Sequence, residues 1–508
     1  MKKSIKKNLI YLLLMNYILV GNYNSMGQSL LSELNSIALD NDMMGASFVV
    51  FCESQVIHSF YYGKSDLQRN IDVNPNTKYR IASISKTITA IAVMQLVEQN
   101  LLDLNTDIGT ILGFNVENPN YPNTAITVEM LLSHTSSIID GSTYSDFLQA
   151  TINDFPIPNL SELLTPSGSF YTTGQFNNVM PGSYFNYSNI NFVILGTIVE
   201  KISNLRFDMY CRQNIFQPLE IDASFNVNDL QDIDEVAVLY RKINTTWTPQ
   251  ADNYQGVQPV FTNLTGYIPG TNGGRFGPQG GLRCSAEDLS KIVMCIFNPS
   301  LSSTPLLTSE SVVDMMADHW TFDGTNGNNY SGLFLSWGLG IHRITSTPGN
   351  DLVLPGSSSM FGHTGEAYGL VSDAYYDTTR KVGFVFITNG VGVGYQTNNN
   401  SAFYTIEQDV FNAIENQGNL SSCLAMDIDS EMSIDDSFHF FPNPTRYSIN
   451  LIIDKINPST HLKIYSADGT LVKEANINYP QSIIDVSQLK SGVYILQIEG
   501  RKKRFIKL

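Results

Sequence analysis

Hydrophobic positions along the chain repeat with two different periods, and the change from one to the other separates strands from helices. The segment GASFVVFCESQVIHSFYYGKSD, Gly45 to Asp66, contains two β-rich runs on either side of a polar turn at residues 53–55, which predicts an antiparallel hairpin. From Ser83 to Asn100, and again from Thr127, apolar residues recur at helical spacing, and Thr127 suits the N-cap of a helix. We therefore expect helices to follow the first strands.

The later segments continue this alternation. Apolar residues recur at helical spacing in Ser188 to Ser203 and in Ser285 to Phe297, and Ser285 begins a capping-box pattern. A second hairpin is predicted from Gly369 to Gly390, followed by an amphipathic helix at residues 402–416. Strands at both ends with helices between them predict an α/β (α+β) domain over residues 28–416. Its mainly antiparallel sheet would be flanked by helices and would carry a helical subdomain.

The two ends of the chain have different patterns. Four lysines precede an apolar stretch, Leu9 to Val20, that is too short to span a bilayer comfortably, so residues 1–27 are predicted to be a signal peptide, with an uncleaved anchor helix as the alternative. Residues 417–436 are polar and acidic, which is typical of a linker. Residues 437–508 alternate short β-rich runs with turn dipeptides such as Asp468-Gly469, which predicts a small β-sandwich.

Charge and cysteine content exclude some classes of function. The formal net charge of −17 argues against a nucleic acid partner, because phosphate binding needs clustered Lys and Arg. The 5 cysteines and 7 histidines have no metal-ligand spacing, so neither a metal nor a cofactor is expected. A cysteine pair cannot be deduced, and we favour buried cysteines that pack as small hydrophobic residues. The cysteines are Cys52, Cys211, Cys284, Cys295 and Cys423.

The first candidate for chemistry is Ser83 with Lys86. Residues three apart lie on nearly the same face of a helix, so the Ser83 hydroxyl and the Lys86 amine are expected to meet, as a nucleophile and its base must. The Ser-x-x-Lys pattern also begins at Ser4 and at Ser487, but only Ser83 opens a predicted helix within a domain large enough to bury a site. By itself the pattern also fits an N-capping serine followed by a surface lysine.

Two further motifs follow in order along the chain. Tyr187 and Asn189 form a Tyr-x-Asn pattern just before a predicted helix, and His363-Thr364-Gly365 precedes the second hairpin. With RIASISKTITA, LLSHTSS, PGSYFNYSN and GPQGGLRCSAEDLSK, they make the chain resemble the serine-active-site family of penicillin-recognising enzymes over roughly Leu30 to Asn416. Within that family it resembles class C β-lactamases and the related D-alanyl-D-alanine carboxypeptidases, D-aminopeptidases and esterases.

The resemblance implies a role for each catalytic residue. Ser83 would be the nucleophile that forms an acyl-enzyme, and Lys86 would be the base or would activate it. Tyr187 would carry a proton to the leaving group, and the sequence leaves open which of Lys86 and Tyr187 is the base. Asn189 would bind the amide of the substrate or hold Lys86, and a helix N-cap is the alternative reading of this residue.

The His-Thr-Gly motif is assigned to substrate binding. The resemblance implies an oxyanion site made by the backbone N–H groups of Ser83 and Glu366, with Gly365 allowing a strand edge to approach the substrate, and it includes Thr364 in the motif. His363 stands where class C β-lactamases usually carry lysine, which lowers the expectation of lactam hydrolysis. It would bind a substrate carboxylate when protonated, or through a hydrogen bond when neutral. We interpret His134 in LLSHTSS as a structural histidine at a helix end.

The C-terminal region, with FPNP at Phe441 to Pro444 and SGVYILQI at Ser491 to Ile498, resembles the sorting domain of the bacterial type IX secretion system. The resemblance implies the type IX secretion machinery as a partner and export through the periplasm of a Gram-negative bacterium. The destination would be the medium or the cell surface. The leading hypothesis is a secreted serine hydrolase of D-amino-acid peptides, β-lactams or small esters. The alternatives are a catalytically silent binding protein and a surface adhesin.

Overall fold

The computed structural model describes two separate parts of the chain. The first is residues 30–417 without 54, 261–263, 300–301, 303, 356 and 358–359. The second is residues 438–507 without 442–444, 446, 454–459, 467–469, 478, 480, 491 and 499–500. The chain divides into two compact units, Met1–Leu424 and Ala425–Leu508. The predicted signal peptide and, except for its first residue, the predicted linker lie outside the described residues.

A nine-stranded antiparallel sheet forms the centre of the first unit, in the order β3-β2-β1-β13-β12-β11-β10-β9-β8. The N-terminal hairpin lies beside the C-terminal one because β1 pairs with β13, with Phe48 opposite Phe386. The strands are β1 (Gly45–Cys52), β2 (Gln55–Asp66), β3 (Ile71–Asp72), β8 (Trp320–Thr321), β9 (Ser336–Trp337), β10 (His342–Ile344), β11 (Met360–Ala367), β12 (Leu370–Asp377) and β13 (Val382–Thr388). Both predicted hairpins and the antiparallel sheet are confirmed.

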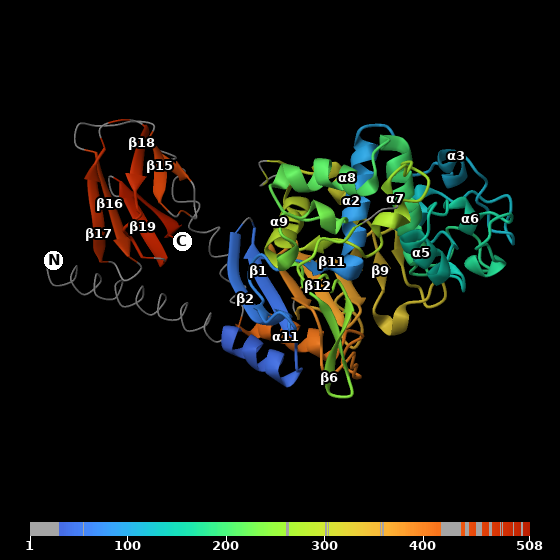
Figure 1. The fold of residues 1–508 in the computed structure, drawn as a ribbon, viewed down its shortest axis with the longest axis horizontal. Helices are drawn as coiled ribbons and strands as arrows, with labels where there is room; N and C mark the ends of the chain where they lie inside the picture. Colours follow the sequence, from blue (N-terminus) through green and yellow to red (C-terminus); the bar gives the residue numbers. More distant parts are fainter. Residues whose placement is uncertain are drawn as a thin grey trace, which may run out of the picture. The chain divides into compact units, whose positions relative to one another are not determined.

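Helices cover both faces of the sheet, as Figure 1 shows, and alternate residues of the central strands enter two cores. Val49 and Val385 pack with the helices on one face, whereas Phe48 and Phe384 pack on the other. Because both faces are buried, β1 reads as a nearly continuous apolar run. The first face carries α2 (Ser85–Glu98) and α9 (Ala286–Phe297), and the second carries the helix of residues 30–40 and α11 (Thr405–Gln417).

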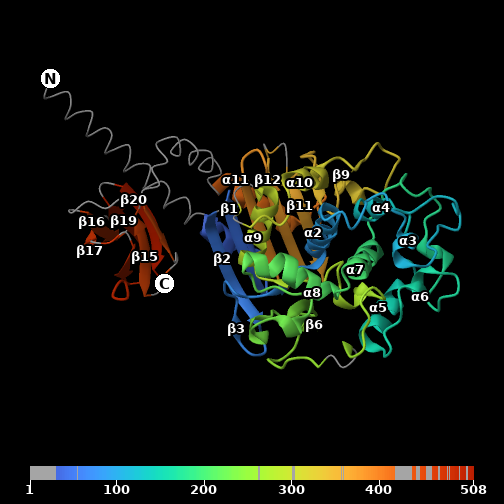
Figure 2. The ribbon, with the colours of Figure 1, turned by 90° about the horizontal axis from the view of Figure 1, so that it is seen from above.

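The remaining helices belong to the first face and to the subdomain inserted between α2 and α7, which is seen at one end of the unit in Figure 2. They are α3 (Ile108–Leu112), α4 (Val128–Leu132), α5 (Tyr144–Asn153), α6 (Ser161–Leu164), α7 (Asn189–Ser203), α8 (Phe207–Cys211) and α10 (Ser309–Met316). The predicted caps are confirmed, since Thr127 and Ser285 accept hydrogen bonds from the first turns of α4 and α9. One boundary was wrong: Ser83 lies in a short 3₁₀ turn, Ala82–Ile84, and α2 begins at Ser85.

The second unit contains two small sheets with one shared core, which confirms the predicted sandwich. The sheets are β14-β15-β18 and β17-β16-β19-β20, and residues such as Leu451 and Leu496 meet between them. The strands are β14 (Phe438–Phe441), β15 (Ser448–Ile453), β16 (His461–Ser466), β17 (Leu471–Asn476), β18 (Gln481–Asp485), β19 (Gly492–Ile498) and β20 (Arg501–Lys507).

The cysteines behave partly as expected. Cys211, Cys284 and Cys295 are free and buried, as small hydrophobic residues would be, whereas Cys52 is disulfide-bonded. Over the described ranges, no helix has both the length and the apolar character required to cross a membrane.

Candidate active site

Ser83 lies in a tight turn that is pressed against strand β11. Ala82, just before it, has a φ of +48°, a conformation that residues other than glycine rarely adopt. A Cβ at Gly365 would lie 2.8 Å from the carbonyl oxygen of Ile81, so a glycine is required where β11 passes this turn. We expected Gly365 to let the strand edge approach the substrate closely. In the structure, Gly365 lets the strand approach the turn that carries Ser83. Ser83 itself is partly exposed.

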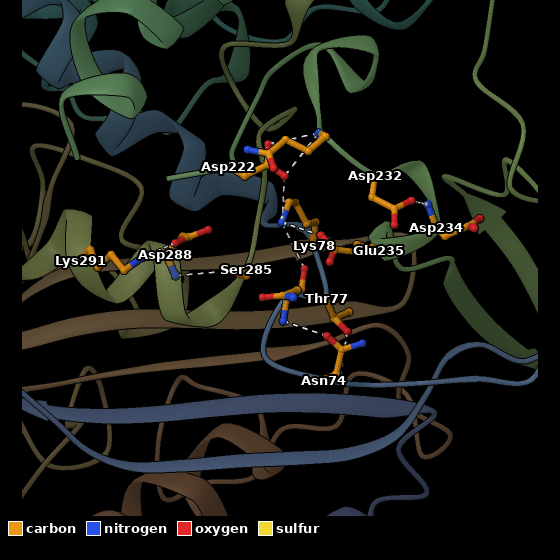
Figure 3. Close-up of polar contacts among 12 residues, drawn as sticks. Asn74, Thr77, Lys78, Asp222, Asp232, Asp234, Glu235, Ser285, Asp288 and Lys291 are labelled. Atoms are coloured by element: carbon orange, nitrogen blue, oxygen red, sulfur yellow. Dashed lines mark hydrogen bonds and ion pairs between the residues drawn. The ribbon is translucent and has the colours of Figure 1, made fainter. Parts of the chain in front are cut away.

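The segment that leads to Ser83 is anchored by a buried lysine. Lys78 is 3% exposed and pairs with Asp222 at 3.2 Å and with Glu235 at 3.1 Å (Figure 3). Its main chain also bonds residues 235 and 237, and β4 (Tyr79–Arg80) then pairs with β7 (Arg283–Cys284). These contacts fix residues 78–80, the segment that leads into the turn at Ser83.

Lys86 is completely buried, and its amine makes three hydrogen bonds at the N-terminal end of α2. Its Nζ donates to Ser83 Oγ at 3.0 Å, to Asn189 Oδ1 at 2.8 Å and to the carbonyl oxygen of Gln279 at 2.8 Å. Burial lowers the pKa of Lys86 to about 7, and the charge of Asp140 opposes that shift. The amine is therefore close to half neutral at physiological pH while it contacts the Ser83 hydroxyl.

Tyr187 has the opposite shift. Its ring lies beside the Lys86 amine, 4.8 Å from Nζ to the ring centroid, and it stacks on Phe334. Desolvation raises the pKa of Tyr187 far above 10, although a hydrogen bond with Ser83 partly offsets this. The phenol therefore keeps its proton at neutral pH.

Asn189 is held by a carboxylate that the sequence analysis missed. Asp140 accepts hydrogen bonds from the Asn189 side chain at 2.8 Å and from the backbone N–H groups of Asn189 and Ile190 at 3.1 and 2.9 Å. Its negative charge thus lies at the N-terminus of α7, where the helix dipole favours it. The alternative reading of Asn189 as an N-cap is wrong, because Ser188 holds the N-cap position and α7 begins at Asn189.

His134 fixes the segment that contains Tyr187. Its ring Nδ1 accepts the Ser188 N–H at 3.1 Å, its carbonyl accepts the Asn186 N–H at 2.9 Å, and its ring lies 4.4 Å from that of Tyr187. Burial lowers the pKa of His134 well below 6.5, so it is neutral and acts as an acceptor through Nδ1. The structural interpretation of His134 matches these contacts.

His363 does not reach the cleft in this structure. It is 1% exposed, its ring lies 5.4 Å from that of Trp337 and 6.0 Å from that of Tyr187, and burial lowers its pKa well below 6.5. Binding of a substrate carboxylate by a protonated His363 is therefore not supported, because burial keeps the ring neutral. A hydrogen bond from the neutral ring is not supported either, because His363 is enclosed and does not line the cleft. We interpret His363 as a packing partner of Tyr187.

Thr364 and Glu366 direct their side chains to the other face of β11. Thr364 donates to Glu407 at 2.9 Å, and Glu366 accepts from Tyr404 at 2.5 Å; both partners belong to α11 or immediately precede it. Beyond Gly362, β11 has no pairing with β10, so its outer edge is open there. Although its side chain points to the other face, residue Glu366 still borders the cleft, whereas Thr364 does not.

A cleft of about 780 Å³ opens from Ser83. Its wall combines apolar side chains with several arginines, and Asn189 and Gln279 lie in it next to Ser83. Lys86, Tyr187 and His363 are absent from its surface. Within the described residues, no group of three or more His, Cys, Asp or Glu could hold a metal ion.

Sequence comparison places this site in a known family. The profile of the family described as Beta-lactamase matches residues 30–402, and that of the secretion system C-terminal sorting domain matches residues 439–508. The chain belongs to the beta-lactamase family. Its C-terminal sorting domain marks it for export by type IX secretion to the cell surface or beyond.

Individual relatives of this family member are distant. The protein flp of Staphylococcus aureus (strain MRSA252) is 28% identical over 186 residues, which is 36% of this chain and only 35% of that protein. A beta-lactamase of Yersinia enterocolitica is 23% identical over 421 residues, 77% of this chain and 95% of that one. The octameric penicillin-binding protein homologue from Pyrococcus abyssi shares the fold, with a TM-score of 0.57, 18% identity and coverage of 94% of this chain and 99% of that one.

Within this beta-lactamase family member, the structure brings together Ser83, Lys86, Tyr187 and Asn189 from segments about 100 residues apart. Asp140 and the carbonyl of Gln279 were not predicted from the sequence. Gln279 lies in the GPQGGLRC stretch that contributed to the resemblance, so the sequence indicated that this stretch lies near the site. Nothing in the sequence indicated Asp140, because a lone aspartate in a loop has no periodic or motif context.

Proposed function

We propose that this protein is an exported serine hydrolase that forms an acyl-enzyme at Ser83 and acts on ester or amide bonds. The observation that carries the proposal is the amine of Lys86, which lies 3.0 Å from the Ser83 hydroxyl and has a pKa near 7. A serine hydroxyl needs such a base because it is a weak nucleophile at neutral pH. A buried lysine that is partly neutral can take the proton as the hydroxyl attacks a carbonyl.

The opposite pKa shifts favour Lys86 over Tyr187 as the base. A phenolate at Tyr187 would have to form against a pKa raised by desolvation, whereas neutral Lys86 is present at physiological pH. In the proposed reaction Ser83 Oγ bonds to the carbonyl carbon while its proton passes to Lys86. The bond to the leaving group then breaks, and Tyr187 donates the phenol proton that the leaving group needs and regains one from Lys86. Water hydrolyses the acyl-enzyme by the reverse proton path.

The oxyanion would be bound by the backbone N–H groups of Ser83 and Glu366, which line the same cleft. Asn189 would hold Lys86 in place, supported by the carboxylate of Asp140. We assign this chemistry to a domain of residues 28–416, and export to the sandwich of residues 437–508 behind a linker at 417–436. The signal peptide of residues 1–27 would direct passage into the periplasm of a Gram-negative bacterium.

The candidate substrates are D-amino-acid peptides, β-lactams and small esters. The Yersinia enterocolitica relative is a beta-lactamase by name, which supports an amide bond of this kind. The histidine at position 363, where class C enzymes usually carry lysine, supports ester or peptide substrates over lactams. Attachment to the cell surface after export would keep the enzyme near peptidoglycan-derived or environmental substrates.

A fluorophosphonate probe tests the proposal directly. Intact-mass and peptide analysis should locate one covalent adduct on Ser83, and Ser83→Ala should abolish both labelling and the turnover of p-nitrophenyl esters. Ser145→Ala is the matched control, because Ser145 is an exposed serine of the same cleft and should label normally. A chromogenic cephalosporin and a D-alanyl-D-alanine peptide, assayed side by side with the ester, would rank the substrate classes. Labelling elsewhere, or full turnover in Ser83→Ala, would refute the acyl-enzyme.

A further inference from the structure

The cleft at Ser83 has the opposite charge to the chain around it. The protein has a formal net charge of −17, yet the residues that line the cleft include four arginines and one acidic residue, whose carboxylate is bonded by Tyr404. The arginines are Arg80, Arg241, Arg275 and Arg283, and the acidic residue is Glu366. A local reversal of charge in a cleft with low-dielectric walls concentrates ligands of the opposite sign, here anions.

Two of these arginines are committed to the structure. Arg80 and Arg283 both form bidentate pairs with buried Asp252, the closest at 2.8 and 2.6 Å. Burial by itself would raise the pKa of Asp252, but the two guanidinium groups more than offset it and hold that pKa well below its ordinary value. One carboxylate neutralises only one of the two cations, so this cluster still contributes a positive charge to the cleft wall.

Arg241 differs because it is exposed. It lies on β5 (Leu239–Ile243), beside the turn between β11 and β12, and its guanidinium group stacks over Tyr395 at 5.5 Å from the ring centroid. In the part of the chain that the structure describes, no carboxylate forms an ion pair with it. Glu366, the acidic residue of the cleft, is bonded by Tyr404 instead. Tyr395 thus holds the guanidinium group of Arg241 by stacking, and the N–H groups of that guanidinium remain available to bind an anionic ligand.

Apolar side chains also line the cleft. Helix α5 contributes Leu148 and Ile152, with Ile152 55% exposed, and Leu264 and Phe276 continue the surface. An exposed isoleucine in the same cleft as the nucleophile favours an apolar ligand that covers it. A ligand that suits both the arginines and the apolar side chains carries an anionic group on an apolar body.

The position of the cleft decides which half of the substrate enters it. The proposed proton donor to the leaving group, Tyr187, and its neighbour His363 do not line the cleft, whereas Glu366 and Tyr368, further along β11 and its turn, do. The leaving group therefore departs on the Tyr187 side, and the acyl group lies in the cleft. We propose that the enzyme selects acyl groups that carry a negative charge on an apolar or aromatic body, and that Arg241 binds this charge. This inference rests on the proposed function and adds the class of acyl group.

Paired esters with one leaving group test this selection. The p-nitrophenyl esters of phenylacetic acid and of (4-carboxyphenyl)acetic acid differ only in a remote carboxylate that cannot reach its own ester carbonyl. The full chain should show a higher kcat/KM for the carboxylate ester. In Arg241→Gln this preference should fall by about 10- to 100-fold, the range expected for a charge-assisted pair, while turnover of the neutral ester stays the same. Added salt should weaken the preference in the unchanged protein.

Lys242→Gln is the matched control. It removes the same charge from the next residue of the same strand, but Lys242 pairs with Asp42 and does not line the cleft, so the preference should persist. An unchanged preference in Arg241→Gln, or no preference in a protein that labels at Ser83 and hydrolyses the neutral ester, would overturn this inference and leave the proposed function standing. Absence of labelling and of turnover of both esters would overturn both.

Discussion

The two sides of Ser83 have contrasting environments. On one side, Lys86, His134 and His363 are almost completely enclosed among aromatic rings, and desolvation lowers the pKa of all three. On the other side, the cleft is open and is lined by arginines, of which Arg241 is exposed. Burial changes protonation states, which acid–base chemistry needs, whereas an exposed charge can select a ligand without a large desolvation cost. The enclosed side should therefore control kcat for every substrate, and the cleft side should control discrimination among substrates.

The sharpest test of the enclosed side is Lys86→Met, which keeps an unbranched stem and removes the amine. Loss of general-base catalysis should lower kcat/KM by about 10³-fold for neutral and carboxylate esters alike. Stopped-flow or single-turnover acylation measures the effect, and thermal unfolding checks that the variant is folded. A loss of less than about tenfold would mean that another group is the base.

Tyr187→Phe should have an effect that depends on the leaving group. An alkoxide or amine leaving group needs a proton and should lose about 10²-fold in rate, whereas p-nitrophenolate leaves without one and should lose much less. A plot of log kcat/KM against the pKa of the leaving group should therefore become steeper in the variant. An equal loss across the series would contradict the role of Tyr187 as donor.

His134 offers a pair of variants that separates position from chemistry. His134 has a φ of +59° and supplies the acceptor for the Ser188 N–H. His134→Leu should destabilise the fold by about 2 kcal/mol and lower kcat by roughly tenfold, because the acceptor is lost and a branched residue is strained there. His134→Asn should recover much of both, since asparagine tolerates this φ and offers a carbonyl. If His134→Asn behaved as His134→Leu does, the positioning role would be refuted.

The pH profile tests the charge state of Lys86. Neutral lysine is the base, so kcat/KM should rise with pH and level off above the folded pKa, which is about 7. The charge of Asp140 raises the pKa of Lys86, so Asp140→Asn should move this limb to lower pH. Asp146→Asn is the control, because Asp146 is an exposed carboxylate in the first turn of α5. A limb that moves to higher pH in Asp140→Asn would contradict the assignment.

The smallest effect is expected on the cleft side. Ile152→Ser removes apolar surface that is already exposed, so stability should hardly change. The KM for a phenylacetyl ester should rise by about threefold to fivefold, as expected for partial loss of one buried apolar contact, with kcat unchanged. A fall in kcat of the same size would contradict the assignment of substrate discrimination to the cleft side and of kcat to the enclosed side.

Local patterns were sufficient for much of the fold. The caps at Thr127 and Ser285, the two hairpins and the helices came from periodicity and short-range hydrogen bonding, because those signals lie within a few residues of each other. Strand β1 could also be predicted from the sequence, because burial on both faces of the sheet leaves a nearly uninterrupted apolar run. The start of α2 was missed by two residues, because the turn at Ser83 depends on packing against Gly365 rather than on local propensity.

The sequence by itself determined which residue types were available for acyl transfer, through the spacing of Ser83 and Lys86 and the two later motifs. Only the tertiary structure decided how they act. Contacts between residues far apart in the chain, such as Asp140 with Asn189 and Lys86 with the carbonyl of Gln279, leave no periodic trace. The enclosure of His363 and the exposure of Arg241 likewise depend on what packs around them. Desolvation, which lowers the pKa of His363, is a property of the folded environment.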